Sequence, residues 1–468
     1  MPNLRFSLPI GVAAGCLAAF ALPTAVPAAP QANAAALAVS VVAAPVVTRD
    51  PAALPGLLAN YDAMKPGPER EALALAIDRH AGQRYATVSR LYWYTDLAAA
   101  EVAARAAHKP ILALRMLGRL DEDLSCANSR LFRTTLYANT TVSNFLRDHF
   151  VLYWSSERPV PKVTIEFGDG RTIQGTTTGN SAHYVLDETG AVLDVLPGIY
   201  APVAFTAELT KSLALAKQVA RLGPTQRHNT LRLYHQAAQE KLAKDWTAVA
   251  GTPYLPGRRA LTTQADIDSV LALAQRATMA KAYIEVPQLR AITAGTDPGA
   301  ISDGELALWA AAGQKTWNLG GGAVTVSTQV LAALEAGAGG ATLGFVGAPP
   351  RKGKGVAPAP APVPVLDARS RALITTLHTA GAMSATPEQI ATVISRLEQH
   401  IVADSALNQF KLRRQIHDHL RSNPEQPFGA LNAWIYADVF HTPSTDIWLG
   451  LLPRVDFTGL PGDGAAMP

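Results

Sequence analysis

Cys126 is the residue whose type and setting best suit chemistry, because it opens a predicted helix in the pattern Cys126-Ala-Asn-Ser129. A thiol at a helix N-terminus gains stabilisation of its thiolate from free N–H groups and the helix dipole. The carboxylates at 121–123 oppose that stabilisation, whereas Arg130 supports it. Two interpretations therefore stay open: a reactive single thiol, or a small helix residue without chemistry.

A second pattern with chemical potential is His417-Asp-His419. On a helix, residues two apart point about 200° away from each other, so these imidazoles are not expected to share one metal ion. Arg413, Arg414 and Arg421 lie nearby. We expect a solvated basic helix face here, and we predict no metal site.

Other catalytic and cofactor motifs are missing from the sequence. It contains no H-E-x-x-H, G-x-S-x-G or C-x-x-C-H pattern, and its Gly-rich stretches do not form a phosphate-binding loop. Two cysteines are too few for a four-cysteine zinc module or a disulfide framework. We expect no cofactor.

Composition limits the class of protein. The 41 basic and 37 acidic side chains give a formal charge of +4 over 468 residues, and no dense basic run occurs, which argues against nucleic-acid binding. With 48% hydrophobic residues, the chain has enough apolar material for buried cores, so wholesale disorder is excluded.

The elements around Cys126 alternate between strands and helices. Short apolar runs predict strands, Ala-rich or amphipathic runs predict helices, and Asp-Gly marks a tight turn. The predicted strands are 91–94, 111–116 and 150–154, the hairpins 163–173 and 183–196, and the helices 96–108, 126–138, 141–149 and 203–221.

The rest of the chain is predicted to be mostly helical. A Lys/Gly/Pro-rich spacer at 349–364 interrupts it. The apolar residues after 404 are expected to form a small helical core with an aromatic plug, the alternative being a partner-binding groove. Helices are predicted at 226–246, 263–295, 303–314, 326–337, 386–402, 404–422 and 428–439.

The element order over 89–222 resembles that of exported thioredoxin-like proteins. Asp96 to Lys109-Pro110 is similar to the family's helix and Lys-Pro strand opening, and His183 to Gly198 is similar to its closing hairpin. The resemblance implies an α/β domain with a mixed sheet flanked by helices, and it places Cys126 at the family's nucleophile position.

Several residues depart from the family pattern at that site. Ser129 stands where the family has its resolving cysteine, Ser125 where an aromatic residue usually precedes the nucleophile, and Leu114 where a buried acid is expected. Ser181 stands where the family places its cis-proline. Without a second thiol the chain cannot resolve a mixed disulfide in the usual way.

The N-terminus reads as an export signal at 1–28. Arg5 precedes an apolar run, and small residues between 25 and 36 offer cleavage sites. Prolines interrupt the run and argue against a spanning helix, and no membrane span is expected after signal cleavage. Removal of Cys16 would leave Cys126 as the single thiol of an exported, periplasmic or extracellular protein.

These observations predict a six-part chain. The predicted function is weak or monothiol redox chemistry, or binding of thiol clients, by the thioredoxin-like domain. The alternative is that the protein is a non-catalytic interaction or scaffold protein of the cell envelope. Cys126 and Ser129 are the candidate catalytic residues. Ser125, Arg130 and Ser181 are predicted either to support these two residues or to contact the client. A protein thiol or disulfide client is the expected partner. The parts are a signal peptide (1–28), a tether with short helices (29–88), the thioredoxin-like domain (89–222), a helical region (223–348), the spacer (349–364) and a helical C-terminal domain (365–468).

Overall fold

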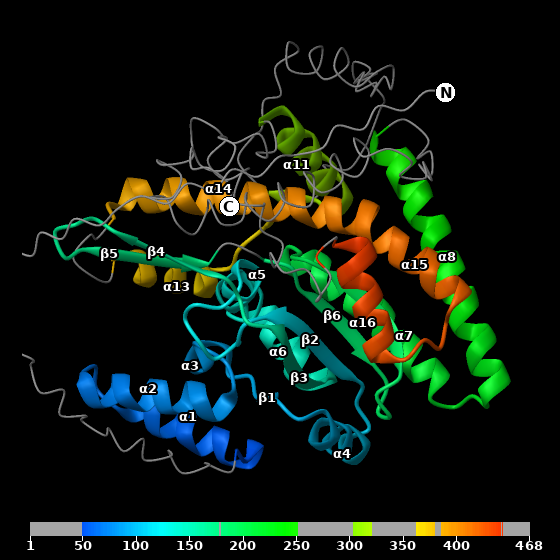
Figure 1. Ribbon diagram of the computed structural model, residues 1–468, viewed down its shortest axis with the longest axis horizontal. Coiled ribbons are helices and arrows are strands. Elements are labelled where there is room, and N and C mark those ends of the chain that lie inside the picture. The colour runs from blue at the N-terminus through cyan, green and yellow to red at the C-terminus, as the bar shows by residue number, and fades with distance from the viewer. Residues whose placement is uncertain are drawn as a thin grey trace, which may run out of the picture. The chain divides into compact units, whose positions relative to one another are not determined.

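Figure 1 shows the computed structural model of the chain, which divides into two units at residues 48 and 49. The structure describes residues 49–176, 179–250, 303–320, 362–379, 385–440 and 442, all in the second unit. The expected signal peptide, most of the spacer, and the helices predicted at 263–295 and 326–337 lie outside these residues.

A mixed five-stranded sheet forms the centre of the second unit. Its strand order is β1-β3-β2-β6-β7; the first three are parallel, β6 is antiparallel to β2, and β7 is antiparallel to β6. Residues on both faces of β2, β6 and β7 are buried, which explains their nearly continuous apolar sequence. The strands are β1 (Trp93–Tyr94), β2 (Ile111–Leu117), β3 (Val151–Arg158), β6 (Ala182–Leu186) and β7 (Val192–Pro197).

Helices flank this sheet, and the predicted mixed sheet with flanking helices is confirmed. α4 packs against β1, β2 and β3, α6 against β3, and α7 against β6 and β7. The separate hairpin β4–β5 stands between β3 and β6 in the chain. The remaining bounds are α4 (Leu97–Ala107), α5 (Ala127–Leu131), the π-helical turn η2 (Phe132–Leu136), α6 (Thr140–His149), β4 (Lys162–Glu166), β5 (Thr172–Thr176) and α7 (Pro202–Val219).

Local signals explain where these helices begin and end. The Asp96 carboxylate caps α4 by accepting from the N–H groups of Ala98 and Ala99, and Asn139 caps α6 in the same way. α4 ends at His108, which has a left-handed φ of 50°, two residues before Pro110. The predicted boundaries of α4, β2 and β3 therefore agree with the structure to within a few residues.

The helices α1, α2 and α3 precede the sheet and have their own small core. α1 (Leu54–Ala63), α2 (Pro68–Ala81) and α3 (Ala86–Ser89) bury a separate apolar cluster that includes Leu58 and Ile77. The buried Trp93 indole on β1 donates to the Gln83 side chain at 2.7 Å, which joins this cluster to the sheet.

The C-terminal region is helical, as expected, and it shares one hydrophobic core with the sheet. α8 packs against α15, and α11 against α14. α13 was not predicted, and the last two residues of the predicted spacer pair with Leu319–Gly320 as a short strand. The helices are α8 (Pro224–Ala250), α11 (Asp303–Trp317), α13 (Ala368–Thr379), α14 (Pro387–Leu407), α15 (Arg414–Ser422) and α16 (Phe428–Trp434), with π-helical turns η3 (Asn408–Arg413) and η4 (Ile435–Val439).

Gly198 shows how closely the helices approach the sheet. Its φ is +70°, and a Cβ there would lie 2.5 Å from the Asn408 amide nitrogen. That amide instead donates to the Ile199 carbonyl at 2.7 Å.

Among the described helices, none has the length and hydropathy that a bilayer span requires.

Candidate functional site

Cys126 lies at the N-cap of α5, where the sequence pattern placed it. Its Sγ accepts a hydrogen bond from the Ser129 N–H at 3.4 Å. The side chain is 0% exposed. A thiol with no solvent contact cannot attack a disulfide in another protein without a structural opening.

Ser125 and Ser129, which the sequence analysis named, lie beside the thiol together with Arg133, which it did not name. The buried Ser129 hydroxyl donates to the Ser125 hydroxyl at 2.5 Å, and the Arg133 guanidinium donates to the same Ser125 oxygen at 3.1 Å. The nearby carboxylates have cationic partners, because Asp121 pairs with Arg119 and Asp123 with Arg84.

The segment that leads into β6 covers the first turn of α5. The Thr176 hydroxyl donates to the Ser125 carbonyl at 2.9 Å, and Arg130 donates to the same hydroxyl at 2.9 Å. Gly179 lies so close that a Cβ there would be 3.1 Å from the Ala127 Cβ. Ser181 is fully buried at the end of this segment, and its hydroxyl has no hydrogen-bond partner among the described residues.

The C-terminal helix completes the cover. The Tyr436 hydroxyl donates to the Asn180 carbonyl at 3.3 Å, and the Asn180 amide donates to the Thr442 hydroxyl at 2.8 Å. Burial raises the pKa of the hydroxyls of Tyr137 and Tyr436. Both rings belong to the same hydrophobic core as Cys126.

Asn432 fastens this helix to the sheet. Its Oδ1 accepts from the Tyr184 hydroxyl at 2.9 Å, and its amide nitrogen donates to Glu157 at 2.7 Å. We define the C-terminal cap as residues 428–440 and 442, which hold Asn432, Tyr436 and Thr442. The cap joins β3, β6 and the covering segment to one helix.

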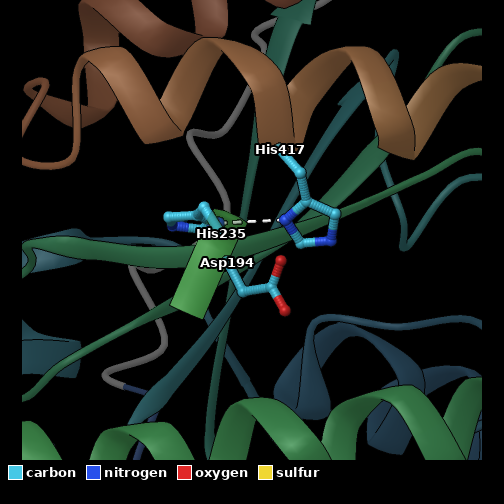
Figure 2. A group of neighbouring side chains, drawn as sticks. All are labelled: Asp194, His235 and His417. Atoms are coloured by element: carbon cyan, nitrogen blue, oxygen red, sulfur yellow. Dashed lines mark hydrogen bonds between the residues drawn. The ribbon is translucent and has the colours of Figure 1, made fainter. Parts of the chain in front are cut away.

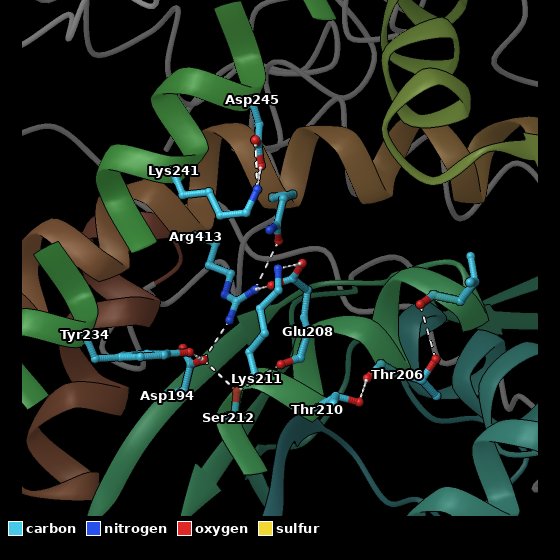
Figure 3. Close-up of polar contacts among 12 residues, drawn as sticks. Asp194, Thr206, Glu208, Thr210, Lys211, Ser212, Tyr234, Lys241, Asp245 and Arg413 are labelled. Atoms are coloured by element: carbon cyan, nitrogen blue, oxygen red, sulfur yellow. Dashed lines mark hydrogen bonds and ion pairs between the residues drawn. The ribbon is translucent and has the colours of Figure 1, made fainter. Parts of the chain in front are cut away.

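A second polar centre lies at the edge strand β7, around Asp194. Its Oδ2 accepts from Arg413 and Ser212, both at 2.6 Å, and from the Tyr234 hydroxyl at 2.7 Å. Its Oδ1 accepts from the Val195 N–H at 2.8 Å. Figure 3 shows Arg413 between Asp194 and Glu208, both of which it binds.

Charge pairing keeps these buried groups ionised. Burial alone would raise the pKa of both carboxylates, but the Arg413 guanidinium holds the pKa of Asp194 and of Glu208 below the usual range. In return, despite burial, the two carboxylates raise the pKa of Arg413 well above its usual value. Arg413 is therefore a permanent cation in the interior.

The expected solvated basic face on the helix at 413–421 is wrong for Arg413 and His417. The two residues are one helical turn apart, so both point into the protein with Ile416 and Leu420, and all four are buried. Arg421 is exposed as expected. His419 donates to or accepts from Gln426 and stacks on Trp434, so the predicted separation of His417 and His419 is confirmed.

His417 contacts His235 instead, as Figure 2 shows. Their Nδ1 atoms are 2.9 Å apart, so one ring donates to the other. Burial lowers the pKa of His235 to about 4, and burial and then Arg413 lower that of His417 well below its usual value. Both imidazoles are therefore neutral near pH 7.

A cavity of about 210 Å³ opens beside this cluster. His417, Arg413, Tyr234 and Glu208 belong to its walls, together with Lys211, Lys241, Asp245 and apolar residues of α8. The residues of this polar centre come from segments far apart in the sequence, so no local sequence motif indicates it. One signal was available: Asp194 interrupts the apolar strand Val192–Leu196, where a charge needs a buried partner.

No protein-family model, curated protein or solved structure matches this chain.

Proposed function

We propose that this chain is an interaction or scaffold protein built on a thioredoxin-like domain whose thiol site is closed. The observation that carries the proposal is the complete burial of Cys126 beneath the covering segment and the C-terminal cap. In this proposal the helices after α7 belong to the same folded body as the sheet and present surfaces to a partner.

The element order and the position of Cys126 support the thioredoxin-like part. Strand, helix, strand, helix, strand, hairpin and helix follow one another from β1 to α7, with the extra hairpin β4–β5 inserted before β6. Cys126 caps the helix that follows the Lys109-Pro110 strand, as the resemblance implies.

The chemistry around the thiol supports the non-catalytic part. Ser129 is hydrogen-bonded within the protein, and a serine hydroxyl does not displace a thiolate from a disulfide. Leu114 is fully buried in the place where the family has an acid, so no carboxylate is there to accept a proton. A catalytic cycle would lack both its second thiol and its base.

Location and partner follow from the same proposal. An export signal at the N-terminus would deliver the chain to the periplasm or beyond, where disulfides form readily. A scaffold there gains from burying its one remaining thiol, because a buried thiol resists oxidation and mispairing. The partner would be another envelope protein.

The native protein is expected to resist alkylation of Cys126. With iodoacetamide at pH 8.5, the intact mass of the mature chain, which lacks Cys16, should show no adduct over an hour, while the same chain unfolded in urea reacts completely. Insulin reduction should stay at the background rate with or without added thiol. Rapid native labelling, or thiol-dependent turnover, would contradict the scaffold proposal.

A second candidate function is monothiol capture of a client after the cap moves away. The Ser129 N–H that points at the Cys126 sulfur favours it, because a helix N-terminus stabilises a thiolate. Replacing Tyr436 with alanine should then speed alkylation of Cys126 at least tenfold, since it removes a fully buried ring from the cover.

Trp434→Ala is the matched control for this test. Trp434 belongs to the same helical stretch but is only partly buried and stacks on His419. Capture gains support if Tyr436→Ala, and not Trp434→Ala, also forms a stable adduct with oxidised glutathione that Cys126→Ser abolishes. Equal labelling of wild type and Tyr436→Ala would rule out the cap as the gate.

A further inference from the structure

Three residues of metal-ligand type converge beside β7. Asp194 lies on β7, His235 on α8 and His417 on α15, and each offers a ligand atom within 4.8 Å of those of the other two. All three are almost fully buried. Figure 2 shows both imidazoles and the carboxylate facing one space.

We propose that Asp194, His235 and His417 bind one divalent first-row transition-metal ion, with Zn²⁺ as the reference ion. Two imidazoles and one carboxylate are a ligand set that such ions prefer. An ion centred among three atoms no more than 4.8 Å apart lies within about 2.8 Å of each. Shifts of less than about 1 Å reach the bonding distances of roughly 2.0–2.2 Å.

The carboxylate has a free position for the ion. Oδ2 of Asp194 already accepts from Arg413, Ser212 and Tyr234, whereas among the described residues Oδ1 accepts only from the Val195 N–H. Hydrogen bonds to the non-ligating oxygen orient a carboxylate ligand, as partners outside the ligand sphere commonly do. The ion can therefore bind Oδ1 while the existing bonds to Oδ2 remain.

Apart from these small shifts, binding of the ion requires one change of tautomer in the two histidines. At present one Nδ1–H donates to the other Nδ1. When the ion replaces this bond, that proton moves to Nε2 of the same ring, and no electron is gained or lost. Neutral imidazoles, the form that burial favours here, are the form that binds metal.

The cavity supplies an entry path and room for a water ligand. His417 and Tyr234 line its wall, and its volume of about 210 Å³ exceeds what one water needs. The positive charge of Arg413 next to the site is offset by Glu208, with which it pairs. A site with three protein ligands would keep one open position.

Metal titration of the whole, tag-free chain tests this inference. After removal of metal by chelation, Zn²⁺ should bind with a stoichiometry of one per chain and raise the melting temperature as its concentration rises. Co²⁺ should give the visible absorption of a low-coordinate site. His235→Ala and His417→Ala should lose both signals, and Tyr234→Phe should weaken Zn²⁺ binding by about tenfold or more.

His419→Ala is the matched control, because His419 lies on the same helix and contacts Gln426 instead. Circular dichroism shows which variants fold; if neither histidine variant does, the Co²⁺ spectrum of wild type and the Tyr234→Phe affinity decide. A folded wild type that binds no Zn²⁺ would overturn the inference, as would binding that His417→Ala leaves unchanged. Asp194, His235 and His417 would then form a buried polar cluster between β7, α8 and α15 that binds no metal ion.

Discussion

Arg413→Met is expected to lower the free energy of unfolding by about 3–5 kcal/mol, because it leaves Asp194 and Glu208 buried without their shared cation. Asp194 would keep only its neutral donors, and Glu208 would keep Lys211 at the cavity edge. Methionine fills a similar volume, so the loss measures the charge and its hydrogen bonds more than a cavity. Urea denaturation followed by circular dichroism gives the value.

Arg421→Met is the control for that loss. Arg421 lies two turns further along the same helical stretch and makes an exposed ion pair with Asp418 at 2.9 Å, so its removal should cost less than about 1 kcal/mol. Arg413→Met combined with Asp194→Asn should recover part of the loss, because one unpaired charge is removed. A single-variant loss below 1 kcal/mol would show that Arg413 does not hold the β7 edge to the helices.

Acidification from pH 7 to pH 5 is expected to destabilise the chelated protein by several kcal/mol. Burial lowers the pKa of His183 to about 3 and that of His235 to about 4, whereas the unfolded chain binds these protons near pH 6.5. The unfolded state therefore takes up more protons as the pH falls. Each such histidine costs about 1.4 kcal/mol per pH unit between about 6.5 and its folded pKa.

Asp194 adds to the same trend at lower pH. Its folded pKa lies below the value of about 3.9 in an unfolded chain, so its contribution is present at neutral pH and is lost as the pH falls below about 4. Both the buried histidines and Asp194 thus lower the free energy of unfolding in acid. Denaturant midpoints measured at intervals between pH 7.5 and 3 will show both parts of the slope.

His183→Gln identifies one source of this slope. His183 is buried on β6 and bonded to the Tyr137 hydroxyl at 2.7 Å, so its removal should flatten the dependence by about 1.4 kcal/mol per pH unit below pH 6. His108→Gln serves as the control, because that side chain is 90% exposed. An unchanged slope in His183→Gln would contradict the assignment.

The sequence by itself determined the local structure of the sheet region. Short apolar runs, the Ala-rich run that begins at Asp96 and the Asp-Gly turn predicted the order of strands and helices from β1 to α7, and Cys126 was correctly placed at a helix start. These features depend on residues within about one turn of each other, and short-range sterics and hydrogen bonds act at that distance.

Only the tertiary structure decided whether the candidate sites are open and which residues meet. Cys126 is fully buried, with Gly179 packed against the next residue, Ala127, and His417 meets His235 from 182 positions away in the chain. Arg413 looked like part of a solvated face because its local neighbours are polar, yet its partners Asp194 and Glu208 arrive from β7 and α7. Burial and charge pairing depend on which distant surfaces pack together, and spacing along the chain does not encode that.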